Sequence, residues 1–265
     1  MILSRSTRRA VGGLLFASGL LLGALPVLAQ DDAPVIAAAA DLKFAVTEIA
    51  TAFEADTGKR VELSFGSTGN FSTQIREGAP FQLYMAADEK YILDLAAEGC
   101  TRDEGRLYAQ GRIVMMVPHG STLNADGTLE TLKAALASGT ITRFAIANPE
   151  HAPYGVRAME ALQHARLWEA VEPRLALGEN VSQAAQFALS GNAEGGIIAY
   201  SLALSDEVSA LGEYELIPAE WHEPLNQRMV LLNSAGSTAE AFYDYMSAPA
   251  AREIMKKYGF VLPGE

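Results

Sequence analysis

The sequence predicts an α/β fold with two lobes, each a mostly parallel sheet flanked by helices. Apolar strand-like segments alternate with amphipathic helix-like segments between residues 34 and 99, and a second alternating set follows residue 111. Such alternation is typical of parallel sheets covered by helices. No low-complexity linker separates the two sets, so crossing strands rather than a flexible tether are expected to join the lobes.

The first set contains three strand and helix pairs. Segment 42–58 is amphipathic, with Leu42, Val46, Ile49 and Phe53 on one face and Gly58 at its end. The predicted strands are 34–40, 60–66 and 81–88, and the predicted helices are 42–58, 70–77 and 89–99. This βαβαβα order indicates one parallel sheet.

The second set opens on an apolar strand, 112–118, which Pro118 closes. Further strands are predicted at 141–147, 174–177, 195–201 and 214–217, with helices at 128–138, 155–166 and 181–190. A strand at 227–233 and two helices around Pro249, within 237–260, complete the chain. The lobes are predicted to comprise residues 30–110 with 228–265, and residues 111–227, with crossings near 106–114 and 224–230.

Residues 1–29 have the pattern of a signal peptide. Arg5, Arg8 and Arg9 precede an apolar stretch that runs to about Leu28, and Ala29 marks the expected cleavage point. A membrane anchor is the competing interpretation, but several glycines and a proline interrupt a stretch that is short for a stable span. We therefore expect export of the protein.

The composition excludes several classes of function. The chain carries a net charge of −12 and has no cluster of Lys and Arg after the leader, which argues against nucleic acid as a partner. Cys100 is the one cysteine, so no intrachain disulfide can form. The four histidines are scattered without the spacing of metal ligands, and we expect neither a zinc site nor a cofactor.

The residues at the starts of four predicted helices are the candidate binding site. Small or capping residues occur there in the segments Ala40-Asp41-Leu42, Gly66-Ser67-Thr68-Gly69-Asn70, Pro153-Tyr154-Gly155 and Asn180-Val181-Ser182. A helix amino terminus exposes unpaired N–H groups and the positive end of the peptide dipoles. Several such ends around one cleft can bind a dianion without any cationic side chain. Asp41 is expected to be an N-cap that offers its backbone N–H to the site.

Five segments together resemble one family. AAAADLKFAVTEIATAFEADTG, FGSTGNFSTQIREGAPFQLYMAADEKYI, IANPEHAPYGVRAMEAL, LGENVSQAAQFALSG and AFYDYMSAPAAREIMKKYGF are similar to the periplasmic molybdate-binding proteins of ABC transporters. The resemblance covers nearly the whole chain after the leader, in order. It implies a two-lobed periplasmic-binding-protein fold, a location in the periplasm, molybdate or tungstate as the ligand, a membrane permease as the partner, and a monomeric, non-enzymatic protein.

Carried over by position, the resemblance implies an oxyanion site of backbone N–H groups and hydroxyls. Its residues are Ala40, Asp41, Ser67, Thr68, Tyr154 and Val181. These are the junctions that the helix starts select.

Two of the departures from the family pattern concern the binding site. Family members commonly have Ser, Thr or Asn where this chain has Ala40-Asp41, so a side-chain donor is lost. Ala199 takes the position of a tyrosine that many members carry. Tyr200 follows it, and strand alternation points its ring to the other face.

Two other functions stay open from the sequence. The lost donor at Ala40-Asp41 leaves room for a receptor of the same fold that binds sulfate, phosphate, chromate or a small organic anion. An enzyme is the third alternative, although the chain has no G-x-S-x-G elbow, H-E-x-x-H motif or P-loop.

Overall fold

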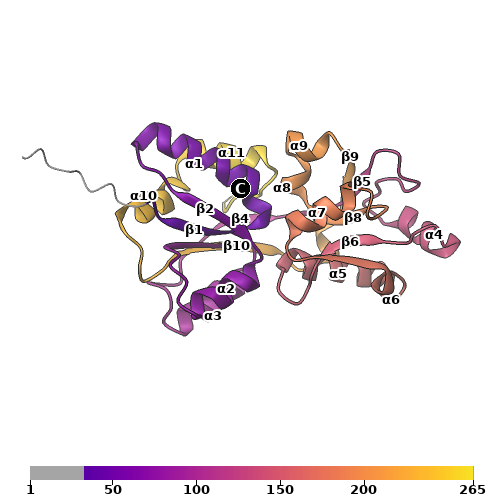
Figure 1. Cartoon of the computed structure of the whole chain (residues 1–265), viewed down its shortest axis with the longest axis horizontal. Helices are drawn as coiled ribbons and strands as arrows, with labels where there is room; N and C mark the ends of the chain where they lie inside the picture. The colour runs from indigo at the N-terminus through magenta and orange to yellow at the C-terminus, as the bar shows by residue number, and fades with distance from the viewer. Residues whose placement is uncertain (1–32, 265) are drawn as a thin grey trace, which may run out of the picture. The chain divides into compact units, whose positions relative to one another are not determined.

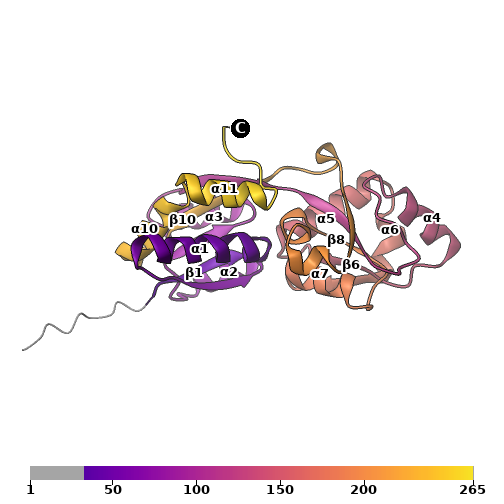
Figure 2. The same ribbon diagram turned by 90° about the horizontal axis from the view of Figure 1, so that it is seen from above.

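Two five-stranded sheets organise the computed structural model, which describes residues 33–264. The first sheet contains β1 (Val35–Ala39), β2 (Glu62–Gly66), β3 (Leu83–Ala86), β4 (Arg106–Gly111) and β10 (Leu225–Leu231). The second contains β5 (Ile113–Pro118), β6 (Phe144–Ala147), β7 (Leu175–Gly178), β8 (Gly196–Ala199) and β9 (Gly212–Leu216). Figures 1 and 2 show each sheet with its own helices. The two-lobed α/β prediction is confirmed.

The two sheets have the same topology. Their strand orders are β2-β1-β3-β10-β4 and β7-β6-β8-β5-β9. In each sheet four strands run in one direction, and a single strand, β10 or β5, is antiparallel to both neighbours. Each sheet is therefore mixed rather than fully parallel. The strand that follows each crossing, β5 or β10, runs opposite to the other four strands of its sheet.

Helices cover both faces of each sheet (Figure 1). Those of the first sheet are η1 (Ala40–Leu42), α1 (Lys43–Thr57), α2 (Thr68–Arg76), α3 (Glu89–Ala97), α10 (Ser237–Tyr245) and α11 (Pro249–Lys257). Those of the second are α4 (Glu130–Ser138), α5 (Pro153–His164), α6 (Trp168–Val171), η2 (Glu172–Arg174), α7 (Val181–Leu189), α8 (Tyr200–Ala203), α9 (Asp206–Ser209) and η3 (Ala219–Trp221). We call the first sheet with its helices lobe 1 and the second lobe 2.

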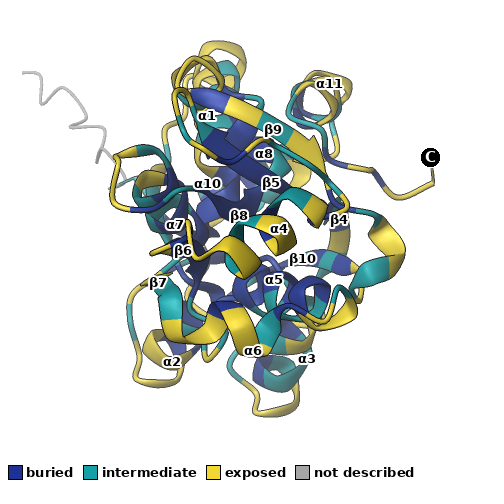
Figure 3. Cartoon of the chain, turned by 90° about the vertical axis from the view of Figure 1, so that its right-hand side faces the viewer, coloured by how far each residue is buried: buried dark blue, intermediate teal, exposed yellow. Residues whose placement is uncertain are grey.

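Strand alternation divides the core of lobe 1 between two helical layers. Ile36 and Met85 pack in one cluster with Val46 and Ile49 of α1. The other cluster contains neighbouring strand residues such as Tyr84, together with Phe71 and Ile75 of α2 and Ile92 and Leu95 of α3. Figure 3 shows buried residues on the strands and exposed residues on the outer helix surfaces.

The chain crosses between the sheets at two places. Only Arg112 separates β4 from β5, and residues 217–224 connect β9 to β10. The lobe boundaries at 110/111 and 227/228 stay predictions, and β10 begins at Leu225. The predicted signal peptide, 1–29, lies outside the described residues.

Several predicted strands are shorter than expected, and in one of them the chain turns directly into a helix. Segment 195–201 was expected to be extended throughout, but β8 ends at Ala199 and Tyr200 begins helix α8. The N–H of Tyr200 donates to the carbonyl of Arg112 at 2.9 Å, at the end of the β5–β8 pairing. The chain turns into helix α8 at this point.

Candidate functional site

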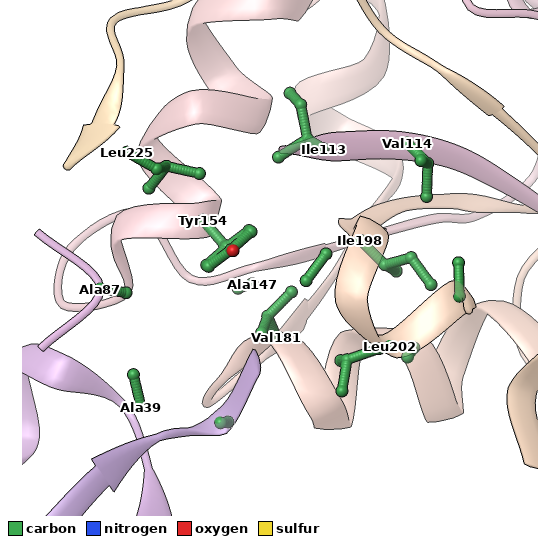
Figure 4. Close-up of a cluster of buried hydrophobic side chains, with 14 of the residues drawn as sticks. Ala39, Ala87, Ile113, Val114, Ala147, Tyr154, Val181, Ile198, Leu202 and Leu225 are labelled. Carbon is green, nitrogen blue, oxygen red and sulfur yellow. The ribbon is translucent and has the colours of Figure 1, made fainter. Parts of the chain in front are cut away.

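A small cavity lies where the carboxyl ends of strands in lobe 1 meet helix starts of lobe 2. Its wall consists of Ala39, Ala40, Asp41, Gly66, Ser67, Thr68, Ala87, Ala152, Pro153, Tyr154, Asn180 and Val181. The structure thus brings all six predicted site residues to one cavity. Figure 4 shows Ala39 of β1, Tyr154 of α5, Val181 of α7 and Ala87, which directly follows β3, around this space.

The cavity suits a small ligand only. The volume open to the centre of a water molecule is about 10 Å³, which is roughly the room that one water needs. A five-atom oxyanion is larger, so it can bind only after a slight separation of the walls. Any organic molecule the size of an amino acid would need a far larger rearrangement.

Backbone N–H groups are the main donors at the cavity. Ala40, Thr68 and Val181 are the first residues of η1, α2 and α7, and Tyr154 is the second residue of α5. N–H groups in a first turn have no acceptor within their helix, and the peptide dipoles place positive charge there. The N-cap residue of α7, Asn180, accepts from Gln183 N at 3.1 Å, so the N–H of Val181 is left available. Four helix starts therefore present neutral donors to one space.

Thr68 adds a hydroxyl to this set. Its Oγ1 accepts a hydrogen bond from the N–H of Ala87 at 3.1 Å, and its carbonyl accepts from the hydroxyl of Tyr84 at 2.8 Å. Both contacts leave the proton on Oγ1 for donation. The hydroxyl is buried and held in place, as a donor to an anion should be.

Ser67 uses its hydroxyl between the lobes. Its Oγ donates to the carbonyl of His151 at 2.6 Å and lies 2.8 Å from Nδ1 of the same residue. Because the Ser67 hydroxyl proton is used in this hydrogen bond, Ser67 can offer only its backbone N–H to the cavity in this conformation.

Asp41 does not act as the predicted N-cap. It lies in the middle of η1, and the helix that follows, α1, has Leu42 at its N-cap position without a side-chain cap. The prediction was wrong because the chain after β1 makes a 3₁₀ turn before α1. The Asp41 carboxylate bonds to two side chains instead of to a helix N–H group. Its Oδ2 accepts from the Tyr154 hydroxyl at 3.0 Å and from Gln227 Nε2 at 2.7 Å.

Sequence reasoning missed two members of this buried network. Gln227 is fully buried, and its Oε1 accepts from the hydroxyl of Tyr108 at 2.7 Å. Both residues lie in strands, β10 and β4, that place them beside Asp41 only after folding. The one sequence signal was a glutamine within an apolar strand segment.

Burial shifts the pKa values of this network. Loss of solvent raises the pKa of Asp41 to about 6, against the lowering effect of the hydrogen bonds from Gln227 and Tyr154. The pKa of the Tyr154 hydroxyl is well above its usual value for the same reason and because of the neighbouring carboxyl. Tyr154 therefore stays protonated and donates, while Asp41 can change its charge near neutral pH.

Further hydrogen bonds join the two lobes around the cavity. In addition to the contacts of Ser67 and Tyr154, they are Gly69 N to His151 O (2.8 Å), Asn70 Nδ2 to Glu179 Oε1 (3.2 Å), Ser182 Oγ to Ala40 O (2.9 Å), Ser201 Oγ to Asp41 O (2.8 Å) and Arg157 Nη2 to Asp88 Oδ2 (2.9 Å). The lobes are in a closed arrangement, with the helix starts directed at each other.

Tyr200 and Ala199 are absent from the cavity wall of the described chain. The ring of Tyr200 instead packs against Tyr214, with centroids 5.9 Å apart. This agrees with the expectation that the ring points away from the site.

A larger groove lies on the surface formed by α1, α7, α8 and α9. It encloses about 280 Å³, and its wall is mostly apolar, with Phe44, Ala185, Leu189, Leu202 and Val208 among its residues. Its wall is largely apolar and includes the carboxylate side chain of Glu207, so it is a poor site for a dianion.

Residues 33–264 contain no group of three or more His, Cys, Asp or Glu side chains that could hold a metal ion. The helices of this part of the chain also include none with the length and apolar character needed to cross a membrane.

Known proteins match most of the chain. Residues 34–261 match the family model of bacterial extracellular solute-binding proteins. The molybdate-binding protein ModA of Azotobacter vinelandii is 36% identical over 91% of this chain and 94% of its own length. ModA of Rhodobacter capsulatus is 34% identical over 92% and 94%. The solved periplasmic molybdate-binding protein of Azotobacter vinelandii superposes with a TM-score of 0.78, at 29% identity over 87% of this chain and 99% of its own.

Proposed function

The chain belongs to the bacterial extracellular solute-binding protein family, and we propose that it is the periplasmic molybdate- and tungstate-binding component of an ABC uptake system. The observation that carries the proposal is the convergence of four helix starts and the Thr68 hydroxyl on one small cavity. The oxyanion would accept hydrogen bonds from the N–H groups of Ala40, Asp41, Ser67, Thr68, Tyr154 and Val181.

The strength of such bonds supports tight binding. A hydrogen bond to a charged group contributes roughly 1.5–3 kcal/mol. Six or seven of them exceed the roughly 8–12 kcal/mol that micromolar to nanomolar affinity requires, after losses for desolvation and ordering. Neutral donors also explain how a chain of net charge −12 can hold a dianion. Screening over about 10 Å limits the repulsion from the acidic surface.

The comparisons support the same biological role. The relatives from Azotobacter vinelandii and Rhodobacter capsulatus are named as binding proteins for molybdate, which favours a receptor over an enzyme. A receptor of this family would be exported, act as a monomer and deliver its ligand to a membrane permease subunit. Closure of the lobes on the ligand would give the permease a surface that reports occupancy.

Thermal unfolding with candidate anions tests the ligand. Micromolar molybdate or tungstate should raise the melting temperature, because a ligand that binds only the folded state stabilises it. The same concentration of sulfate, phosphate or chromate should leave it unchanged. A shift with one of those anions alone would instead support the alternative, a receptor of the same fold for another small anion.

Removal of the Thr68 hydroxyl tests the site. Thr68→Val keeps the shape of the side chain but loses the donor, so molybdate affinity measured by calorimetric titration should fall by about 1–3 kcal/mol. Thr73→Val removes an exposed hydroxyl from the same helix, where it donates to Gly69 O at 3.2 Å, and is the control. Equal affinities for the two variants would place the ligand elsewhere.

A further inference from the structure

The two oxygens of the Asp41 carboxyl group have different surroundings. Oδ2 accepts hydrogen bonds from Tyr154 and Gln227. Oδ1 is buried, and no other residue within 33–264 donates a hydrogen bond to it. The residue is 1% exposed and lies in the wall of the cavity. A buried carboxylate oxygen without a donor is expensive, so a partner is expected for it.

Among residues 33–264, no cationic side chain pairs with Asp41. The titratable groups that face it are the hydroxyls of Tyr154 on α5 and, through Gln227, Tyr108 on β4. The neighbouring elements add no other titratable group that faces Asp41. Helix α7 contains no titratable residue, and Tyr200 of α8 packs against Tyr214. Glu62 of β2 and Lys43 of α1 are exposed, and His151 contacts Ser67. The guanidinium of Arg157 on α5 is paired with Asp88 and Glu160.

An ionised Asp41 and a bound dianion would therefore repel each other strongly, because they lie close together in a buried site where water screens charge poorly. A protonated carboxyl group has the opposite effect, because its O–H donates a hydrogen bond to an anion. The proton has an evident position: Oδ2 already accepts two bonds, whereas Oδ1 has none.

On the basis of the proposed function, we infer that Asp41 takes up a proton with the oxyanion and donates it, from Oδ1, in a hydrogen bond to an anion oxygen. Asp41 then supplies the side-chain donor that Ala40 cannot. The proton comes from solvent, and one is bound for each anion. Burial raises the pKa of Asp41 to about 6 before any ligand is present, so protonation near neutral pH is readily reached.

This inference gives a specific pH dependence. Above pH 6 the free protein has an ionised Asp41, so the observed association constant should fall about tenfold for each pH unit. Below this pH the free protein already carries the proton, and the dependence should flatten. The affinity for molybdate at pH 8.5 should then be on the order of a hundredfold weaker than at pH 6.5.

Calorimetric titration with molybdate measures both quantities on the wild-type protein. Affinities between pH 6 and 8.5 give the slope, over a range in which molybdate itself remains a dianion. Titrations at pH 8 in buffers of different ionisation enthalpy give the number of protons taken up, which should be close to one. Affinity that does not vary with pH, or an uptake near zero, would overturn the inference while leaving the proposed function intact.

Asp41→Asn identifies the group. The amide oxygen can accept from Tyr154 and Gln227 while Nδ2 donates to the anion, so the variant should bind without pH dependence or proton uptake. It should bind molybdate more tightly than wild type at pH 8.5. Asp94→Asn is the matched control, since it changes the net charge equally at a half-exposed carboxylate paired with Lys90, and it should keep the wild-type slope.

The remaining outcomes are also decisive. If Asp41→Asn kept the slope and the uptake, another group would bind the proton, and the inference would be wrong. If Asp41→Asn did not fold, the number of protons taken up by the wild-type protein would still decide whether a proton is bound. Asp41→Ser would then test whether Asp41 binds that proton, because serine cannot take it up. Absence of binding by wild type at every pH, with molybdate and tungstate, would remove the proposed function itself.

Discussion

Gly69→Ala is expected to weaken oxyanion binding by at least about tenfold while the ligand-free protein keeps its melting temperature. Gly69 is the second residue of α2, and its N–H donates to the carbonyl of His151 in lobe 2 at 2.8 Å. A Cβ atom at this position would lie 2.6 Å from that carbonyl oxygen and 3.0 Å from His151 Cα. These are backbone atoms and cannot rotate away, so the lobes would have to separate. The donors of Thr68 and Tyr154 would then move apart.

The stability of lobe 1 should not suffer from this change. Gly69 is not among the glycines with positive φ, and alanine is favoured over glycine inside a helix by up to about 1 kcal/mol. The expected signature is therefore an unchanged or slightly higher melting temperature with a weaker response to molybdate.

Gly236→Ala is the control for Gly69→Ala. Its added Cβ would meet only the side-chain oxygen of Gln82, at 3.5 Å, which is an ordinary contact. Calorimetric titration of both variants measures the affinities, and small-angle scattering with and without molybdate measures closure. Wild-type affinity in Gly69→Ala would show that ligand binding does not require the close approach of α2 to His151.

The site residues that the sequence revealed share one property: each is marked by its local context. Thr68, Tyr154 and Val181 follow turns or capping residues and begin amphipathic segments, so their exposed N–H groups follow from the helix start alone. Gln227 and Tyr108 have no such mark. They reach Asp41 through a hydrogen-bonded chain between residues up to 186 positions apart, which only the folded sheet creates.

The fold shows the same division between local and long-range information. Alternating segments predict strands, helices and a sheet in each lobe, because hydrophobic periodicity is local. The direction of β10 and β5 depends on where the chain crosses between lobes. The sequence predicts crossings near 106–114 and 224–230, but only the pairing of β10 with β3 and β4 shows that a late segment enters the first sheet antiparallel.

Asp41→Asn is expected to stabilise the ligand-free protein at neutral pH. The folded-state pKa of Asp41 is about 6, above its ordinary value of 3.8, so the folded state binds a proton more tightly than the unfolded state does. The free energy of unfolding therefore decreases as the pH rises from about 4 to 6 and is constant above that range. A raised pKa of this size corresponds to a penalty of about 3 kcal/mol at pH 7.5. Asparagine avoids it, because it carries no charge.

The gain should be about 2–3 kcal/mol at pH 7.5 and should fall below about 1 kcal/mol near pH 4, where Asp41 is protonated in the folded protein and only a little over half ionised in the unfolded chain. Urea unfolding at pH 4, 5.5 and 7.5 measures it, with Asp94→Asn again as the control for net charge. A less stable Asp41→Asn at pH 7.5 would mean that the carboxylate is favoured in the folded state and that Oδ1 has a donor. A carboxyl group with this expected cost at neutral pH, on a residue that lines the cavity, is better explained by its role when the ligand binds than by any contribution to the fold.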